Sequence, residues 1–469
     1  MADMVQTKEV GKTPLDDVRY AIGLLAVPMR TLPNFLYWTT GKKAGFMRII
    51  LANRYYYPDQ SATSRMVSSL ASELVRQGIE TTVLASRSYH DKHTEELPSR
   101  ESIDGVDVHR LRTSRFGRAR LVGRAADYAT FHIMAAAWFA KHVRKDDICV
   151  VCTDPPLLAV SVALPIRVRR ARLVNWVMDL FPETAIELGL MNQNTVAGRL
   201  ALALRNWSIR QSSLTICPIE RMARYLSDGD IRPEDFAIAH HWADRNEIFP
   251  VDPNKNALRQ AWGLRRKFVI GYSGNFGRAH EFATVLDAAE RLKNHPEIRF
   301  LMVGEGQQRS FVENEVERRG LTNVTMKPFQ PVERLSESLG VADVHLVSLK
   351  PALEHCIVPS KFYGVLAAAR PTLFIGDTEG EIGSVVRDFQ CGIAVHPGDV
   401  DTLVHSIMHL YQSKLTCKMM GHNARYLMET AYSREYGVAV WQSAIGGLEK
   451  KFSPARMPAL GGHLQPEKL

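Results

Sequence analysis

The sequence lacks any apolar stretch of about 20 residues, which is the length that an α-helix needs to cross a bilayer. Residues 21–28 are apolar but too few, and Asp16 and Asp17 precede them, so this segment does not make a convincing secretory signal. We therefore expect a cytoplasmic protein.

Cysteine is scarce, with 6 residues scattered over 469. The one close pair, Cys149 and Cys152, lies in a valine-rich segment that we expect to be a strand, where a spacing of three points the side chains to opposite faces. This pair is therefore predicted to belong to a core rather than to a redox or zinc site. Reduced thiols also fit the cytosol.

Convincing metal-ligand clusters are missing as well. Residues 228–230 and 399–401 have the form Asp-x-Asp, but both fall in turn-like segments, where a solvated turn is the better explanation. The histidines at 90 and 93, and the pair at 240 and 241, have no third and fourth ligand at a sensible spacing. We therefore expect no metal site.

Acidic residues are absent from a basic segment of a chain whose formal net charge is +9. Six arginines follow one another there without an intervening carboxylate, at positions 110, 112, 115, 118, 120 and 124, and residues 167–172 carry four more. Apolar segments 131–140 and 156–166 adjoin these clusters, which suits contact with an anionic membrane surface. A solvated basic face remains the alternative. No recognition helix or stacking-aromatic motif indicates nucleic-acid binding.

What is present is a globular composition, 45% apolar and 23% charged, in a chain long enough for two domains. Apolar strands alternate with amphipathic helices in two series, which predicts right-handed parallel units and an α/β fold. We expect two Rossmann-like, doubly wound domains facing a cleft. The expected strands are 47–53, 82–85, 148–152, 173–177 and 214–217 in the first series, and 268–273, 300–303, 324–326, 344–349 and 372–376 in the second.

The pattern breaks around residues 241–253, so we place the domain boundary there. The expected domains are 46–246 and 247–430, and residues 431–469 would form a helix that crosses back to the first domain, followed by a tail. Residues 1–45 lack periodicity. They could be disordered, could contact a membrane, or could reflect a start codon assigned too early.

An anion site is indicated where residues 359–371 follow the strand 344–349. Pro359 suits the first turn of a helix, Ser360 offers a hydroxyl to the free backbone N–H groups, and Lys361 adds a cation. The loop 271–278 supplies glycines, which allow close approach of a backbone to phosphate, and Arg278, whose guanidinium can bind two phosphate oxygens. We expect these two cations to converge on one diphosphate.

These motifs together resemble the retaining glycosyltransferases of family 4, which have the GT-B fold, and most of all the bacterial subgroup that builds cell-surface polysaccharides of the colanic acid or O-antigen type. The resemblance rests on residues 271–278, 303–306, 358–361 and 366–371, and in the first domain on residues 57–59 and on 179–183, where relatives carry Asp-Leu-Trp-Pro-Glu. It extends from about residue 47 to about 430.

The resemblance implies a retaining transfer without a cofactor from a UDP- or GDP-linked sugar, and the lack of metal-ligand clusters favours a metal-independent reaction. The arginine clusters beside apolar segments add the expectation of a polyprenyl-diphosphate-linked acceptor at the inner face of the membrane. The diphosphate would contact Arg278 and Lys361, the base would pack near residues 327–330, and Asp179 is the candidate polar residue beside the reacting sugar. A strand-end carboxylate that caps a turn is the alternative for Asp179. The expected donor-binding residues are Gly274, Asn275, Arg278, Phe329, Ser360, Lys361, Tyr363 and Gly364; the expected catalytic residues are Asp179, Arg278 and Lys361.

Two positions depart from the family pattern. Many relatives have two glutamates eight positions apart, where this chain has Cys356 and Gly364, with Glu354 out of register. Residues 60–62 replace two glycines that relatives often have. The departure at Gly364 leaves an alternative function, a catalytically silent family member that binds a nucleotide or a partner and is a scaffold of a polysaccharide assembly complex. An oxidoreductase with a dinucleotide is less favoured, because no Gly-x-Gly-x-x-Gly follows the first strand of either domain.

Overall fold

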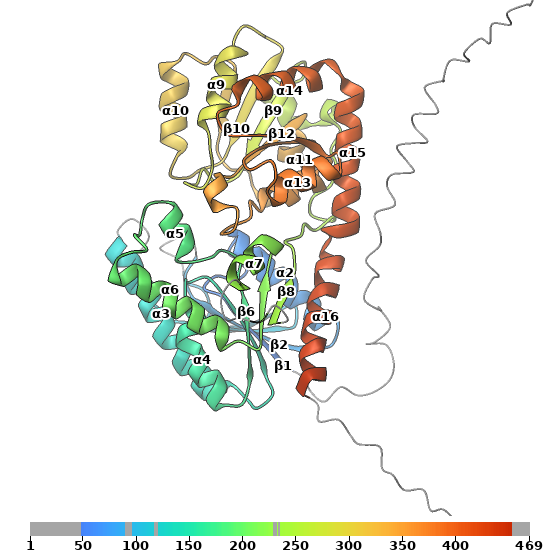
Figure 1. The fold of residues 1–469 in the computed structure, drawn as a ribbon. Helices are drawn as coiled ribbons and strands as arrows, with labels where there is room; N and C mark the ends of the chain where they lie inside the picture. The colour runs from blue at the N-terminus through green and yellow to red at the C-terminus, as the bar shows by residue number, and fades with distance from the viewer. Residues whose placement is uncertain (1–47, 90–95, 117–120, 228–231, 233–234, 453–469) are drawn as a thin grey trace, which may run out of the picture. The chain divides into compact units, whose positions relative to one another are not determined.

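The computed structural model describes residues 48–89, 96–116, 121–227, 232 and 235–452. The expected extension at 1–45, the Asp-x-Asp segment at 228–230, the histidines at 90 and 93, and Arg118 and Arg120 lie outside these residues. Two parallel sheets dominate the fold, and both belong to the unit Ala44–Leu469 (Figure 1). No described helix combines the length and apolar character needed to cross a membrane.

The first sheet has eight strands in the order β3-β4-β2-β1-β5-β6-β7-β8, and all neighbours are parallel except β3 and β4. Its strands are β1 (Arg48–Ala52), β2 (Glu80–Ser86), β3 (Arg100–Ile103), β4 (Val106–Leu111), β5 (Ile148–Cys152), β6 (Arg172–Trp176), β7 (Leu214–Cys217) and β8 (Phe236–Ile238). Its helices are α2 (Ala62–Arg76), α3 (Leu121–His142), α4 (Leu158–Val168), α5 (Glu183–Glu187), α6 (Val196–Arg210) and α7 (Glu220–Ser227). The expectation that residues 214–217 form the last strand is wrong, because β8 continues the sheet.

The second sheet has six strands, all parallel, in the order β11-β10-β9-β12-β13-β14. They are β9 (Phe268–Ser273), β10 (Ile298–Val303), β11 (Val324–Lys327), β12 (Val344–Ser348), β13 (Thr372–Ile375) and β14 (Gly392–Val395). Helices α8 (Ala257–Ala261), α9 (Ala283–Arg291), α10 (Arg309–Arg318), α11 (Leu335–Gly340), α12 (Lys361–Ala367), α13 (Glu381–Asp388), α14 (Val400–Gln412) and α15 (Lys414–Ala431) accompany them, with short 3-10 turns η2 (Pro253–Lys255), η3 (Val332–Arg334) and η4 (Pro351–Leu353). The strand order changes direction at β9 and β12, where ligands of such sheets bind.

The last helix, α16 (Arg434–Phe452), packs into the core of the first sheet, as the expected crossing helix would. Trp441 lies edge-on to Trp176 of β6 with ring centroids 4.6 Å apart, and Ile445 and Leu448 join the same core. Two buried tryptophans at one contact remove a large apolar area from water. Helix α16 is therefore part of the first domain's core.

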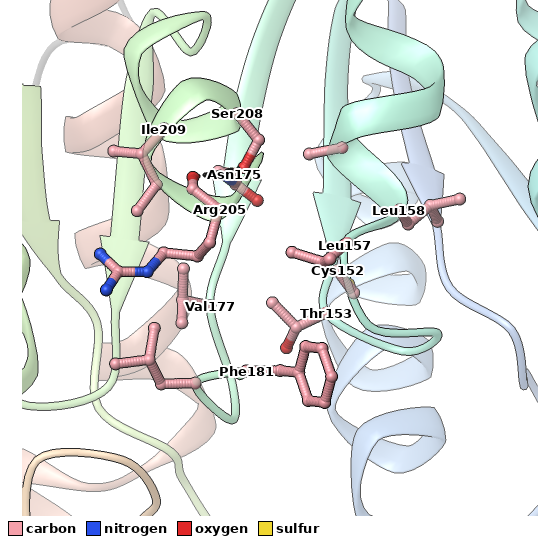
Figure 2. A pocket seen from close by; sticks show the side chains of 12 residues that line it. Cys152, Thr153, Leu157, Leu158, Asn175, Val177, Phe181, Arg205, Ser208 and Ile209 are labelled. Atoms are coloured by element: carbon pink, nitrogen blue, oxygen red, sulfur yellow. Dashed lines mark hydrogen bonds between the residues drawn. The ribbon is translucent and has the colours of Figure 1, made fainter. Parts of the chain in front are cut away.

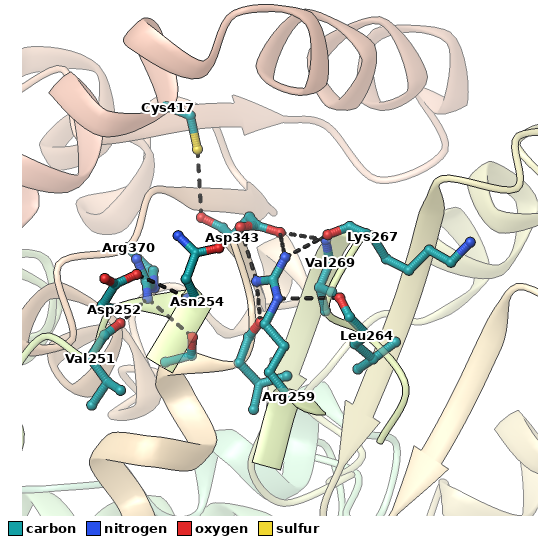
Figure 3. A network of polar contacts seen from close by, with 12 residues as sticks. Val251, Asp252, Asn254, Arg259, Leu264, Lys267, Val269, Asp343, Arg370 and Cys417 are labelled. Carbon is teal, nitrogen blue, oxygen red and sulfur yellow. Dashed lines mark hydrogen bonds and ion pairs between the residues drawn. The ribbon is translucent and has the colours of Figure 1, made fainter. Parts of the chain in front are cut away.

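A buried ion pair holds the amino-terminal edge of the second sheet. The Arg259 guanidinium donates to both carboxylate oxygens of Asp343, at 3.1 and 2.9 Å, and to the carbonyl oxygen of Val341 at 2.7 Å. Asp343 also accepts the backbone N–H of Val269, the second residue of β9, at 2.8 Å (Figure 3). These contacts join α8, β9 and the start of β12, so the Arg259 guanidinium has a structural role in holding these elements together.

Candidate functional site

Lys361 is the first residue of α12, at the side of the second sheet where β9 and β12 end. Its ammonium nitrogen lies 2.5 Å from the Tyr272 hydroxyl oxygen and 3.0 Å from Nε2 of His280. Within the described part of the chain it forms no ion pair. The expected cation is thus held by neutral groups.

The hydrogen bonds around Lys361 determine which partner donates. His280 Nδ1 lies 2.6 Å from the carbonyl oxygen of Ser348, which can only accept, so Nδ1 carries the proton and Nε2 accepts from Lys361. The Tyr272 hydroxyl donates to the carbonyl oxygen of Asn275 at 2.6 Å and therefore also accepts from Lys361. In its ammonium form Lys361 has three N–H donors, and these contacts use two of them.

Lys361 and His280 are both desolvated, with no carboxylate paired to either among the described residues, and this lowers the pKa of each. Desolvation lowers the pKa of Lys361 well below its ordinary value. Burial, together with the nearby Lys361, lowers the pKa of His280 to about 3, so the imidazole stays neutral. An anion that reached the third N–H of Lys361 would favour the ammonium form, so this site is suited to a negatively charged ligand.

The glycine loop that follows β9 is shaped around Lys361. Gly274 has a φ of +148°, and a Cβ there would lie 2.9 Å from Cε of the lysine. Gly304, at the end of β10, approaches the carbonyl oxygen of Gly274 so closely that a Cβ would lie 2.0 Å from it. Side chains at these two positions would displace the loop. Asn275, the residue after Gly274, is exposed.

Arg278 lies in the same loop, two residues before His280, and is exposed. No hydrogen bond or ion pair from the described residues engages its guanidinium, which leaves all its donors for a ligand. The structure places it on the segment that holds Lys361 but shows no direct contact between the two side chains. Phe329, in the loop after β11, is 51% exposed and offers a flat apolar surface.

Ser360 and Tyr363, on either side of Lys361 in sequence, differ in exposure. Ser360 already has helical angles, φ −55° and ψ −23°, and its hydroxyl caps no backbone N–H, so the predicted cap is wrong. Its side chain is exposed instead. Tyr363 is 3% exposed and packs against Tyr432 and His241, with ring centroids 5.1 and 5.9 Å away. The Tyr363 side chain therefore packs α12 against the protein core.

Gly364 and Glu354 occupy different surroundings. A Cβ on Gly364 would meet Ile248 and Leu339 at 3.7 Å, an ordinary contact, so the backbone does not require glycine there. Glu354 is 4% exposed, and burial raises its pKa to about 7. Its carboxylate accepts the backbone N–H of Glu381 at 3.3 Å, and a Cβ on Gly380 would strike it at 2.5 Å. Glu354 therefore binds the start of α13.

Asp179 follows β6 in the first half of the molecule and is exposed. Desolvation of the carboxyl group by the surrounding protein raises the pKa of Asp179 to about 6, although part of the residue reaches solvent. The neighbouring carboxylate of Asp154 adds to this effect. The backbone N–H of Asp179 donates to the Thr153 hydroxyl at 3.3 Å. The next residue, Leu180, donates its N–H to the carbonyl oxygen of Cys356 at 2.8 Å. This bond joins the Asp179 segment to the segment that leads into Lys361.

A small cavity lies beside the Asp179 segment, between α4 and α6 (Figure 2). Its volume is about 20 Å³, room for about one water molecule. Residues from the ends of β5 and β6 and from both helices line it, among them Thr153, Leu158, Phe181 and Arg205. It is too small for a sugar, and it contains none of the residues that surround Lys361.

The metal-binding candidates at 399–401 have structural partners, and His241 is buried. The Asp399 carboxylate accepts the N–H of Thr402 at 3.0 Å and so caps α14; residues 399–401 therefore form a helix start rather than the predicted turn. Asp401 pairs with Arg291. His241 is 8% exposed, and burial lowers its pKa to about 4. Within the residues that the structure covers, no three His, Cys, Asp or Glu side chains gather as metal ligands would.

Sequence reasoning missed the two neutral partners of Lys361. The sequence pattern predicts a buried strand residue at Tyr272 and an ordinary polar loop residue at His280. Only its place in the loop between β9 and α9, at the ligand-binding edge of the sheet, singles out His280. Its accepting nitrogen depends on Ser348, which is 68 positions away.

Comparison with known proteins gives a consistent result for both halves of the chain. Residues 254–426 match the family described as glycosyl transferases group 1, and residues 61–242 match the glycosyl transferase 4-like domain. A probable glycosyltransferase WbjE from Pseudomonas aeruginosa is 22% identical over 389 residues, which is 82% of this chain and 94% of that protein. A putative colanic acid biosynthesis glycosyl transferase WcaI from Escherichia coli (strain K12) is 24% identical, over 77% of this chain and 91% of that protein.

Solved structures share the fold at low identity. Sucrose-phosphate synthase from Thermosynechococcus elongatus matches with a TM-score of 0.69 and 16% identity, covering 87% of this chain and 100% of that one. HepE from Anabaena, in complex with UDP-glucose, matches with a TM-score of 0.63 and 15% identity, covering 86% and 100%. Both likenesses extend over the two sheets.

Proposed function

Because the chain belongs to the family 4 glycosyltransferases with the GT-B fold, we propose that it moves a sugar from a UDP- or GDP-linked donor to a polyprenyl-diphosphate-linked oligosaccharide in exopolysaccharide or O-antigen biosynthesis. Three observations support the proposal: both halves match glycosyltransferase families, one relative is named for colanic acid biosynthesis, and one structural neighbour holds UDP-glucose.

The observation that carries the donor site is the partnering of Lys361. A partly buried lysine whose two protein partners, Tyr272 and His280, are neutral lacks the negative charge that would stabilise it. The donor diphosphate supplies that charge at the third N–H. Arg278, exposed and unpaired among the described residues, adds a second cation on the adjoining loop. Phe329 supplies an apolar surface for the base.

The proposed reaction is a front-face displacement. The bond between the anomeric carbon and the diphosphate oxygen breaks, the acceptor hydroxyl oxygen bonds to the same face of that carbon, and the acceptor proton passes to the departing diphosphate. The anomeric configuration is therefore retained. Lys361 and Arg278 stabilise the charge that develops on the leaving group, the usual task of preorganised cations in such a site. With two cations in that role, the reaction needs no metal.

Asp179 is the proposed polar residue on the acceptor side of the reacting sugar. It is exposed and lies on the segment that the bond from Leu180 to Cys356 ties to the approach to Lys361. With a pKa raised to about 6, it is mainly ionised at neutral pH. Its carboxylate orients a sugar or acceptor hydroxyl by accepting a hydrogen bond. The lipid-linked acceptor would reach it from the inner face of the membrane.

Calorimetric titration tests the donor site. UDP, GDP and their sugars are titrated into the full chain, and into Lys361→Ala and Arg278→Ala. We expect one nucleotide to bind, and both substitutions to weaken its binding by about 1.5–3 kcal/mol, the range for hydrogen bonds to charged groups. If no nucleotide binds, the donor site is refuted, and the scaffold function suggested by Gly364 becomes the better explanation.

A further inference from the structure

Three helices on the first sheet present large apolar side chains to solvent. The exposed residues are Val122, Ile133 and Met134 on α3, Leu164 and Val168 on α4, and Val196, Leu200 and Trp207 on α6. Val122, Val168 and Val196 are 82, 71 and 83% exposed. We call this set the helical face.

On α6 the exposed apolar residues form one stripe. Val196, Leu200, Ala203 and Trp207 are spaced by four, three and four positions, which places them along one side of the helix. The opposite side faces the protein, since Ala201, Ser208 and Ile209 are buried. An apolar stripe that points away from the core is the reverse of what a solvated surface helix requires.

The three helices are neighbours, so their exposed residues form one surface. Helix α4 packs against α3 on one side and α6 on the other. Figure 1 shows α3, α4 and α6 together on the same side of the first sheet, away from α16. Contiguous apolar patches of this kind on a protein surface mark binding sites for other molecules.

The charges on the three helices themselves are almost all positive, although the exposed Asp146 lies just after α3, beside Arg170. The three helices contain a single acidic residue, Asp127, and it is buried. Exposed cations accompany the apolar residues: Lys141, Arg167, Arg169, Arg170, Arg199 and Arg210. Arg169 donates to the carbonyl oxygen of Ala140, at the end of α3, with its Nε 2.8 Å away. The surface thus combines apolar groups with positive charge.

The first arginine cluster contributes less than the sequence suggests. Arg110 is 4% exposed and pairs with Glu101, and Arg115 pairs with Glu96. These two arginines are neutralised within the protein. Among the described residues of that cluster, Arg112 stays exposed, and the cations of the helical face itself are those on α3, α4 and α6 and directly after α4.

We propose that the helical face rests on an anionic lipid bilayer, with its apolar residues in the headgroup and acyl boundary and its cations on lipid phosphates. A bilayer offers both components at once. A second copy of this chain fits less well, because matching faces would bring cations against cations. Helices α4 and α6 also wall the cavity beside Phe181, so docking would hold the acceptor side of the proposed active site at the membrane. This last consequence rests on the proposed function.

Vesicle flotation of the full chain tests the proposal. The vesicles contain phosphatidylglycerol and phosphatidylethanolamine, or phosphatidylcholine alone. The test variant is Leu200→Glu with Trp207→Glu, and the matched control is Leu415→Glu with Met419→Glu on α15, where the two side chains are 69 and 54% exposed. We expect anionic vesicles to bind the protein and the control to bind normally. The test variant should lose at least about tenfold in binding, because a charged carboxylate opposes insertion into the apolar boundary.

A second variant separates charge from apolar contact. Arg167→Glu with Arg210→Glu should also weaken binding, and this effect should shrink as salt is raised. Normal binding by both test variants, or equal losses in test and control, would refute the docking surface. Loss of binding in a chain without residues 1–47, with none in the Leu200→Glu variant, would assign the lipid contact elsewhere.

Two further measurements distinguish the remaining outcomes. If sedimentation shows a dimer that the Leu200→Glu variant abolishes, and vesicles bind neither form, the partner is a second copy and the lipid proposal fails. Nucleotide titration of the flotation variants reports on the donor site separately. Normal nucleotide affinity with lost flotation supports docking alone, whereas flotation without nucleotide binding leaves docking intact and refutes the proposed function.

Discussion

The second sheet holds two cations at its opposite edges, the buried Arg259 and the partly buried Lys361, and their partners differ. Arg259, at the amino-terminal edge, is bound by the Asp343 carboxylate and by carbonyl oxygens of Val341 and Leu264. Lys361, at the carboxyl-terminal edge, is bound by two neutral groups. A buried cation with a carboxylate stabilises the framework, whereas one without a carboxylate leaves its charge available to a ligand. The comparison yields four predictions.

The largest effect is expected from breaking the framework pair. Asp343→Ala leaves the buried Arg259 without its carboxylate and frees the N–H of Val269. We expect the free energy of unfolding, measured with urea, to fall by about 3–5 kcal/mol. The matched control is Asp401→Ala, which breaks the exposed pair with Arg291 and should cost less than about 1 kcal/mol. Equal losses in the two variants would contradict the framework role.

The next effect is on catalysis. Lys361→Met removes a cation that the proposed reaction uses and that folding does not favour. We expect kcat to fall by about 10²–10³, with no loss of stability, because the lysine's burial is not offset by a carboxylate. Lys255→Met, at an exposed lysine of η2, should change neither quantity. A marked loss of stability in Lys361→Met would place this lysine in the same class as Arg259.

A smaller effect is expected at His280. His280→Leu removes the acceptor at Nε2, so Lys361 loses one of its two partners and its fixed position. We expect nucleotide affinity to fall about tenfold, the value of one hydrogen bond to a charged group. His280→Gln can donate to the Ser348 carbonyl and accept from Lys361, so it should restore most of the affinity. If Gln and Leu behave alike, His280 has another role.

The smallest effect is on the pH dependence of stability and of nucleotide binding. The pKa of Lys361 is lowered in the fold and about 10.4 in the unfolded chain. Between these values the unfolded chain binds more protons, so this lysine makes stability rise with pH. Nucleotide binding reverses the shift, takes up a proton, and weakens as pH rises through the lowered pKa. Calorimetry in buffers of different ionisation enthalpy, above about pH 7.5 to avoid the phosphate pKa near 6, measures that uptake. Lys361→Arg should show none.

The alternating apolar pattern predicts the two parallel sheets well, because a buried parallel strand needs a continuous apolar run. Strands β3, β4, β8 and β14 were not predicted. In the case of β8, Phe236–Ile238 is only three residues long and half-buried. The Ser360 cap failed for another reason: the backbone angles that decide capping do not show in residue type. Lys361 and the glycine loop could be recognised from their motifs. The role of His280 could not, because it depends on a carbonyl oxygen in a different strand.

Trp441 has a consequence for recombining this chain with its relatives. Helix α16 is continuous with the second half in sequence but fills the core of the first, and Ala243, before the second sheet, donates its N–H to the carbonyl of Tyr432 at 3.1 Å. A chimera that takes everything after residue 250 from a relative would import a foreign helix against Trp176. A chimera with two crossover points, near residues 250 and 433, would exchange only the second sheet and its helices. Helix α16 and the first sheet would then both keep the sequence of this chain.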